Sequence, residues 1–122
     1  MKAVLVLLLV FAVLSDASKA TQKVKKGARI EIDFQGATVI KRQVAAGTQY
    51  YHFDGPNKGS FVDEKGNKID SSNFEGDNGI LTIKKFTEAD LGTYNRHPNV
   101  FKTPIKGGFT TITGQFLTVE FE

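Results

Sequence analysis

Residues 78–94 read NGILTIKKFTEADLGTY, and this stretch decides the fold class. It opens on Asn78-Gly79, a pair that readily takes up the left-handed backbone of a tight turn. Leu81 and Ile83 then stand two positions apart, the spacing of side chains that share one face of a β-strand. The stretch therefore predicts a turn, a strand over residues 80–86, and a second turn before Tyr94.

The same period of two recurs along the chain, and helical spacing is almost absent. In residues 29–34 apolar residues alternate strictly with charged ones, as a half-buried strand requires. Further strands are expected over residues 38–44, 48–53 and 117–121. Turn-forming residues separate the strands at positions 54–57, 65–67, 77–79 and 106–108. Many short strands in one small domain predict an all-β sandwich or barrel.

The stretch resembles the immunoglobulin-superfamily pattern that runs from strand E through the E–F turn into strand F. The matching positions are Leu81, Ile83, Phe86, Asp90, Gly92 and Tyr94. The resemblance implies a two-sheet antiparallel sandwich in which the Tyr94 hydroxyl bonds back to the upstream backbone, the tyrosine corner. It implies that Asp90 fixes the turn as an acceptor and that Gly92 permits the turn's backbone. The three apolar positions would face the core.

Residues 27–34 resemble strand B of the same family, with Ile32 and Phe34 as core positions. Phe34 stands in the place of the first disulfide cysteine and Arg96 in the place of the second. The chain has no cysteine and no tryptophan, but it has ten phenylalanines, so Phe34 is expected to fill the space of a disulfide. Residues 73–74 offer no arginine to pair with the turn aspartate. The register after Tyr94 stays open, as does the choice of residues 38–44 or 60–63 as strand C.

A second resemblance is local. Residues 43–51, QVAAGTQYY, are similar to the cystatin hairpin that wedges into the cleft of papain-like cysteine proteases. Cystatins carry a long amphipathic helix before that hairpin, whereas the residues before Val44 alternate and include Gly27 and Gly36, which disfavour a helix by about 1 kcal/mol each. An inhibitor of such proteases is therefore the alternative hypothesis.

The N-terminus predicts export. Lys2 precedes an apolar run from Ala3 to Leu14, which is shorter than the roughly 20 residues of a membrane-spanning helix. Residues 1–17 therefore read as a signal peptide, cleaved after Ala17 or Ala20, with a membrane anchor as the weaker alternative. The remainder, residues 22–122, is expected to be one secreted domain with no further membrane anchor.

No catalytic or metal-binding constellation is expected. His52 and His97 lie in different segments, and a zinc site needs three or four ligands. Residues 63–67 lack the alternating oxygen ligands of a calcium loop. The charged residues, 16 basic and 13 acidic, are interspersed, and residues 23–29 are the nearest to a basic patch, which argues against nucleic-acid binding. No enzyme activity, cofactor or metal is therefore predicted.

Recognition of another protein remains, with this chain itself as one possible partner. The run Tyr50, Tyr51, His52 and Phe53 places one alternate pair on each face of a strand, so one pair is expected to face away from the core. Exposed aromatic residues with polar tips are enriched at interfaces. These four residues, with Phe101 in the long connection over residues 95–113, are the predicted contact surface. The sequence does not identify the partner.

Overall fold

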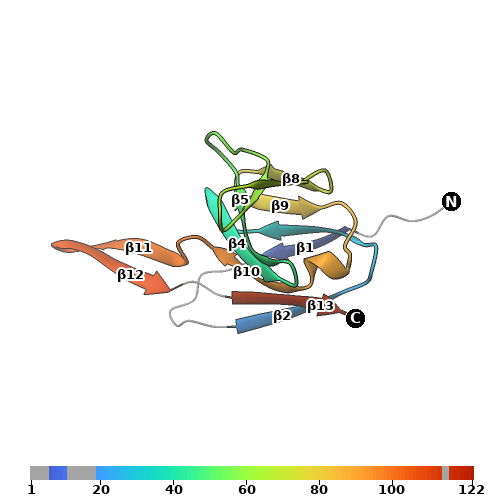
Figure 1. Cartoon of the computed structure of the whole chain (residues 1–122). Helices are drawn as coiled ribbons and strands as arrows, with labels where there is room; N and C mark the ends of the chain where they lie inside the picture. Colours follow the sequence, from blue (N-terminus) through green and yellow to red (C-terminus); the bar gives the residue numbers. More distant parts are fainter. Residues whose placement is uncertain (1–5, 11–18, 114–115) are drawn as a thin grey trace.

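The computed structural model describes residues 6–10, 19–113 and 116–122, and it places them in two facing β-sheets and one separate hairpin (Figure 1). For residues 6–10, 19, 100–105 and 109–113 only the backbone is described. The helical content of the described residues is a single 3-10 turn, η1 (Glu88–Asp90). The predicted all-β, two-sheet fold is therefore confirmed. With no cysteine in the chain, no disulfide links the sheets.

The smaller sheet has four strands in the order β1-β3-β9-β8, and the larger has seven in the order β2-β13-β10-β4-β5-β6-β7. The hairpin consists of β11 and β12. The strands are β1 (Val6–Val10), β2 (Lys19–Val24), β3 (Arg29–Asp33), β4 (Val39–Val44), β5 (Gly47–His52), β6 (Phe61–Asp63), β7 (Lys68–Ile69), β8 (Phe74–Asp77), β9 (Ile80–Ile83), β10 (Gly92–Arg96), β11 (Val100–Ile105), β12 (Gly108–Thr113) and β13 (Phe116–Phe121).

The two candidates for strand C, residues 38–44 and 60–63, take different places in the larger sheet. β4 lies between β10 and β5 at the middle of the larger sheet, whereas residues 60–63 contribute only the short strand β6.

The predicted strand over residues 80–86 was too long, because β9 ends at Ile83. The Asn73 side chain accepts a hydrogen bond from the Lys85 N–H at 3.0 Å and donates one to the Lys85 carbonyl at 2.8 Å. Because Asn73 takes both backbone groups of Lys85, the ladder ends at Ile83.

The core lies between the sheets and is filled by apolar side chains from both. Ile32, Phe34, Leu81, Ile83 and Phe86, the predicted core positions, are all fully buried. Ile30, Ile40, Tyr51, Phe61, Tyr94, Leu117 and Val119 complete the centre of the same cluster. Fully burying one large apolar side chain contributes about 1.5–3 kcal/mol, so this cluster supplies the main stabilisation of the domain.

Among the side chains that the structure describes, two aromatic contacts link the larger sheet to the smaller sheet and the segment that follows it. The rings of Phe61 in β6 and Phe74 in β8 meet edge to face, with centroids 4.8 Å apart. Phe86, just after β9, meets Phe121 of β13 with centroids 5.8 Å apart. Such pairs contribute about 0.5–1.5 kcal/mol beyond the area they bury. They join the two sheets at separate places, in a chain that has no disulfide to do so.

The N-terminal segment is described only in part. Val6–Val10 form β1, which pairs in parallel with β3, and the other residues of the predicted signal segment 1–17 lie outside the described residues. Within the described residues, no helix has the length and apolar character needed to cross a membrane.

Candidate functional site

Tyr94 organises the turn between β9 and β10, which we call the corner. Its side chain is fully buried, and its hydroxyl donates a hydrogen bond to the Asp90 carbonyl oxygen at 2.6 Å. Burial raises the pKa of this hydroxyl to about 12, with the nearby Asp90 carboxylate adding to the rise and the Arg42 guanidinium opposing it. At neutral pH the hydroxyl is therefore protonated and acts as a buried hydrogen-bond donor.

Asp90 links the corner to the central strand. One carboxylate oxygen accepts hydrogen bonds from the Thr87 N–H at 3.0 Å and the Thr87 hydroxyl at 3.3 Å, which closes the turn. The other accepts from the Arg42 guanidinium at 2.8 Å, in an ion pair whose side chains are 5% and 2% exposed. Arg42 also donates to the Gln49 side chain at 2.8 Å. The turn aspartate therefore has a buried arginine partner from β4.

Sequence reasoning looked for this arginine in the wrong place. It considered residues 73–74, whereas the partner is Arg42, two positions after the fully buried Ile40 in β4. The guanidinium lies 4.2 Å from the centroid of the Phe61 ring and 4.9 Å from that of Phe74, an arrangement that favours a cation. Arg42 shares the inward face of β4 with Ile40, and a charged residue at such a position is the sequence feature that could have indicated a buried ion pair.

Gly92 is required by the approach of two strands. Its φ is +152°, and a Cβ at this position would collide with the backbone carbonyl oxygen of Gln43 in the paired strand β4. The corner, the ion pair and Gly92 are thus packed inside the domain. They shape the fold and offer no surface to a ligand.

The predicted contact run on β5 divides between the two faces of the larger sheet. Tyr51 is fully buried and Phe53 is 6% exposed, so both point into the core and are excluded as contact residues. Tyr50 and His52 point to the opposite, outer face and are partly exposed. Phe101 lies in β11, where the side chain is outside the described part of the structure.

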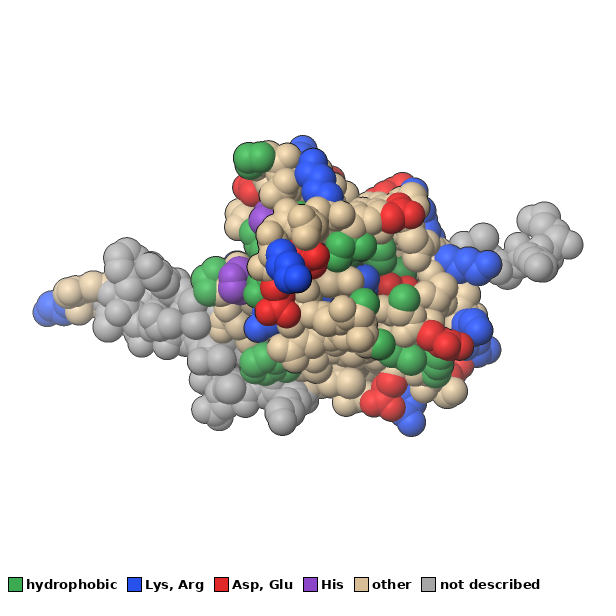
Figure 2. Space-filling model, in the orientation of Figure 1, with side chains coloured by type: hydrophobic (Ala, Val, Ile, Leu, Met, Phe, Trp, Pro, Cys, Tyr) green, Lys and Arg blue, Asp and Glu red, His purple; other side chains and the backbone are tan. Residues whose placement is uncertain are grey.

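A shallow groove lies on that outer face. We call it the histidine groove, and its lining residues are Val39, Tyr50, His52, Val62, Asp63, Glu64, Gly66 and His97. Its volume is about 270 Å³. Strand pairing sets Val39 beside His52 and Tyr50 beside Val62. Figure 2 shows both histidine side chains on the visible face, each next to hydrophobic groups.

The groove brings together residues far apart in sequence. His97 follows β10, and its backbone N–H donates to the Val39 carbonyl at 3.0 Å. Its imidazole meets the Tyr50 ring edge to face, with centroids 4.9 Å apart. Both histidines of the chain therefore line one groove. The sequence analysis placed His97 in a different segment from His52 and did not bring it beside Tyr50, because the pairing of β10 with β4 cannot be seen in the sequence.

The two carboxylates of the groove differ in role. Asp63 accepts hydrogen bonds from the Lys65 and Asn67 N–H groups, each at 2.9 Å, and the bond from Asn67 is the main cause of a pKa below the usual range. Asp63 therefore holds its own turn. Glu64 is exposed and makes no hydrogen bond or ion pair with the described residues, so its charge is available at the rim.

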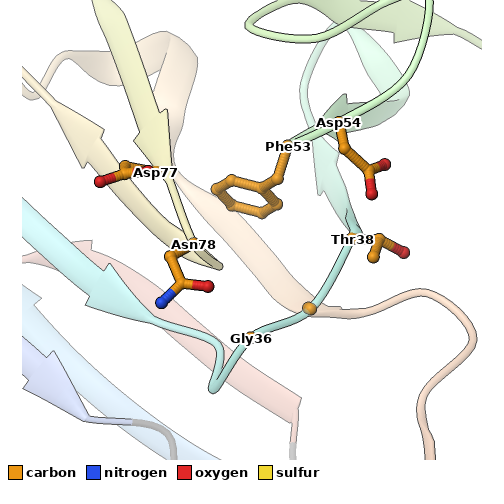
Figure 3. Close-up of a pocket in the computed structure, with 7 residues that line it drawn as sticks. Gly36, Thr38, Phe53, Asp54, Asp77 and Asn78 are labelled. Carbon is orange, nitrogen blue, oxygen red and sulfur yellow. The ribbon is translucent and has the colours of Figure 1, made fainter.

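A second hollow, of about 430 Å³, lies where loops from the two sheets meet (Figure 3). It is lined by Gly36, Ala37, Thr38, Phe53, Asp54, Asp77 and Asn78. In Figure 3 the carboxylates of Asp54 and Asp77 point away from each other on opposite sides of the Phe53 ring. Among the described residues no group of three or more side chains is placed to hold a metal ion. This hollow offers no convergent set of ligands.

No protein-family model matches the chain, and no curated protein is significantly similar to it in sequence. The class that the structure defines is therefore an all-β, two-sheet sandwich without a disulfide.

Proposed function

We propose that the protein is an exported, non-enzymatic binding module of the immunoglobulin-like type, which contacts a partner protein through the outer face of its larger sheet. The tyrosine corner, the turn aspartate and Gly92 support the immunoglobulin-like assignment, because they combine the residue pattern of that family with the geometry expected of it. The predicted signal segment supports export.

The observation that carries the proposal is the histidine groove, which lies over β4, β5 and β6 of the larger sheet. It combines an aromatic ring, two imidazoles and two apolar side chains on a rigid framework of paired strands. Tyrosine is enriched at protein interfaces because its ring supplies contact area while its hydroxyl keeps a polar end. Glu64 at the rim adds a charge that can select the partner.

The outer face of the smaller sheet is a less suitable contact surface. There Glu75 lies between Arg29 at 3.7 Å and Lys84 at 3.4 Å, so its charges neutralise one another across neighbouring strands. Exposed ion pairs of this kind are well solvated and contribute little. The outer face of the larger sheet is thus the candidate contact surface, and the outer face of the smaller sheet serves as the control.

The cystatin-like alternative has less support from the fold than the immunoglobulin-like proposal. Residues 43–51 do form a hairpin, β4–β5, but its strands belong to the centre of the larger sheet. The described residues contain no helix longer than the three residues of η1, so the long helix of cystatins has no counterpart among them.

The test is affinity capture from native extracellular fluid with the mature protein as bait, followed by measurement of binding to the recovered partner. A double variant, Tyr50→Ala with His97→Ala, is expected to weaken binding by about 2 kcal/mol, or roughly thirty-fold, the loss typical of an interface hot spot. Glu31→Ala, on the outer face of the smaller sheet, is the control and is expected to leave affinity unchanged. Equal affinities for the double variant and the wild type would exclude the histidine groove.

A further inference from the structure

The hairpin β11–β12 stands apart from both sheets. Its strands pair over six positions, from Val100 with Thr113 to Ile105 with Gly108, and neither strand pairs with any other described strand. Figure 1 shows it extending away from the two sheets. A two-stranded hairpin is marginally stable by itself in water, and a third strand is the usual remedy. Each strand of the hairpin therefore has one edge that is not paired with another described strand.

Its two outer edges are not equivalent. The pair that flanks a two-residue turn is hydrogen-bonded, and bonded and non-bonded pairs alternate from there along an antiparallel ladder. Ile105 and Gly108 flank the turn at residues 106–107, so Pro104 and Phe109 form a non-bonded pair whose backbone groups face outward. Proline has no N–H, so the outer edge of β11 lacks a donor there.

The outer edge of β12 has no such protection. Its sequence, GFTTIT, contains no proline and no charged residue, and it is rich in β-branched residues. Natural proteins block exposed edges with charge, proline or bulges, because an open edge pairs readily with another strand. The backbone groups of residues 109, 111 and 113 face this edge by the same alternation.

We propose that β12 pairs antiparallel with β12 of a second copy of this chain, around a two-fold axis at Thr111. Outward-facing residues pair with outward-facing residues, so Thr111 lies opposite the partner's Thr111 and Phe109 opposite the partner's Thr113. The result is a four-stranded sheet in the order β11, β12, partner β12, partner β11. Because Pro104 interrupts each outer edge, assembly stops at a closed dimer.

A second copy is the occupant that this edge fits. The strand supplies its own complementary donors and acceptors by two-fold symmetry and carries no charge that would repel its copy. Phe116, the first residue of β13, is 39% exposed and is the one large hydrophobic side chain that is exposed where the structure describes side chains. It lies three positions after Thr113, the last residue of β12, in the sequence. The histidine groove shares no residue with this contact, so a failure of one proposal does not imply a failure of the other.

A single introduced cysteine tests the register, because the chain has none of its own. Thr111→Cys is expected to form a disulfide-linked dimer on mild oxidation, since directly opposed residues in a bonded pair have Cα atoms about 5.5 Å apart, within disulfide range. Thr103→Cys in β11 is the matched control. It is expected to stay monomeric in a non-reducing gel, because three strand spacings of about 4.8 Å separate it from its copy.

The backbone is tested by Thr111→Pro against Thr111→Ala. The proline removes an edge donor in each copy and is expected to raise the dimer dissociation constant in sedimentation equilibrium at least about tenfold, whereas the alanine keeps the donor and the dimer. Circular dichroism checks that both variants are folded. A wild-type protein that stays monomeric at its highest soluble concentration would overturn the proposal. Equal cross-linking of the two cysteine variants, or an undiminished dimer with proline, would do the same.

Discussion

Tyr94 and Tyr51 are both fully buried, but their hydroxyls differ in hydrogen bonding. The Tyr94 hydroxyl donates to the Asp90 carbonyl, whereas the Tyr51 hydroxyl has no hydrogen-bond partner among the described residues. A buried hydrogen bond has a net worth of about 1 kcal/mol, while a buried polar group left without a partner is destabilising. The two residues thus form a natural matched pair.

We expect Tyr94→Phe to lower the free energy of unfolding by about 1 kcal/mol, because it removes the corner hydrogen bond. Tyr51→Phe is expected to leave that free energy unchanged or to raise it slightly, because the unpartnered hydroxyl is removed and the ring stays. Denaturant titration of both variants and the wild type measures the difference. The corner loses its assigned role if the two substitutions have the same effect.

The buried tyrosines also predict how stability depends on alkaline pH. The pKa of Tyr94 is raised from 10.0 to about 12, and that of Tyr51 is raised through burial and the Glu75 carboxylate. The unfolded chain therefore loses these protons first. The stabilisation is complete below pH 10 and is lost as the pH rises toward 12, by an amount on the order of 3 kcal/mol for Tyr94. Unfolding midpoints across this range are expected to fall less steeply in Tyr94→Phe, and parallel slopes would contradict the assignment.

The ion pair between Arg42 and Asp90 is expected to behave as a coupled unit. Removing one partner leaves an uncompensated charge in the core, so Arg42→Met and Asp90→Ala should each destabilise by about 3–5 kcal/mol. The double variant is expected to lose less than the sum of the two single changes, because no charge is then stranded. A double-mutant cycle from denaturant titrations measures this coupling. Strict additivity would show that the pair is not energetically linked.

At the scale of elements, the pairing of β10 with β4 depends on Gly92. We expect Gly92→Ala to destabilise by at least about 2 kcal/mol, because a Cβ there meets the Gln43 carbonyl oxygen and the backbone has a positive φ. The adjacent Thr93→Ala is the control and is expected to have an effect within about 0.5 kcal/mol, because the Thr93 side chain is partly exposed. Thermal unfolding of the two variants makes the comparison. Similar midpoints would show that the strands approach less closely at Gly92.

Strands and turns were the part of the fold that the sequence predicted well. The alternation in residues 29–34 and the glycine-containing turns depend on neighbouring residues, so they are visible in a linear pattern. The end of β9 is not visible in such a pattern, because it depends on Asn73, which lies across a hairpin from Lys85. The partner of Asp90 was missed for the same reason, since only strand pairing brings Arg42 to the corner.

At the scale of the whole molecule, the fold decides which of the predicted contact residues face outward and can form a site. Tyr50 and His52 do so, whereas Tyr51 and Phe53 lie in the core. Alternation along residues 50–53 predicted that one pair would face outward, but it did not say which. The packing of Tyr51 against Phe53 and Phe61, at ring-centroid distances of 5.0 Å each, fixes the inward pair. His97 then joins Tyr50 because β10 lies next to β4. Sequence patterns gave no access to that adjacency.

The central claim is that this cysteine-free chain closes two facing sheets through aromatic contacts. Nuclear Overhauser spectroscopy of the mature protein tests it most directly, because ring protons give cross-peaks only at short range. We expect cross-peaks between the rings of Phe61 and Phe74 and between those of Phe86 and Phe121. Absence of both sets of cross-peaks from the spectrum of the folded protein would contradict the two-sheet closure.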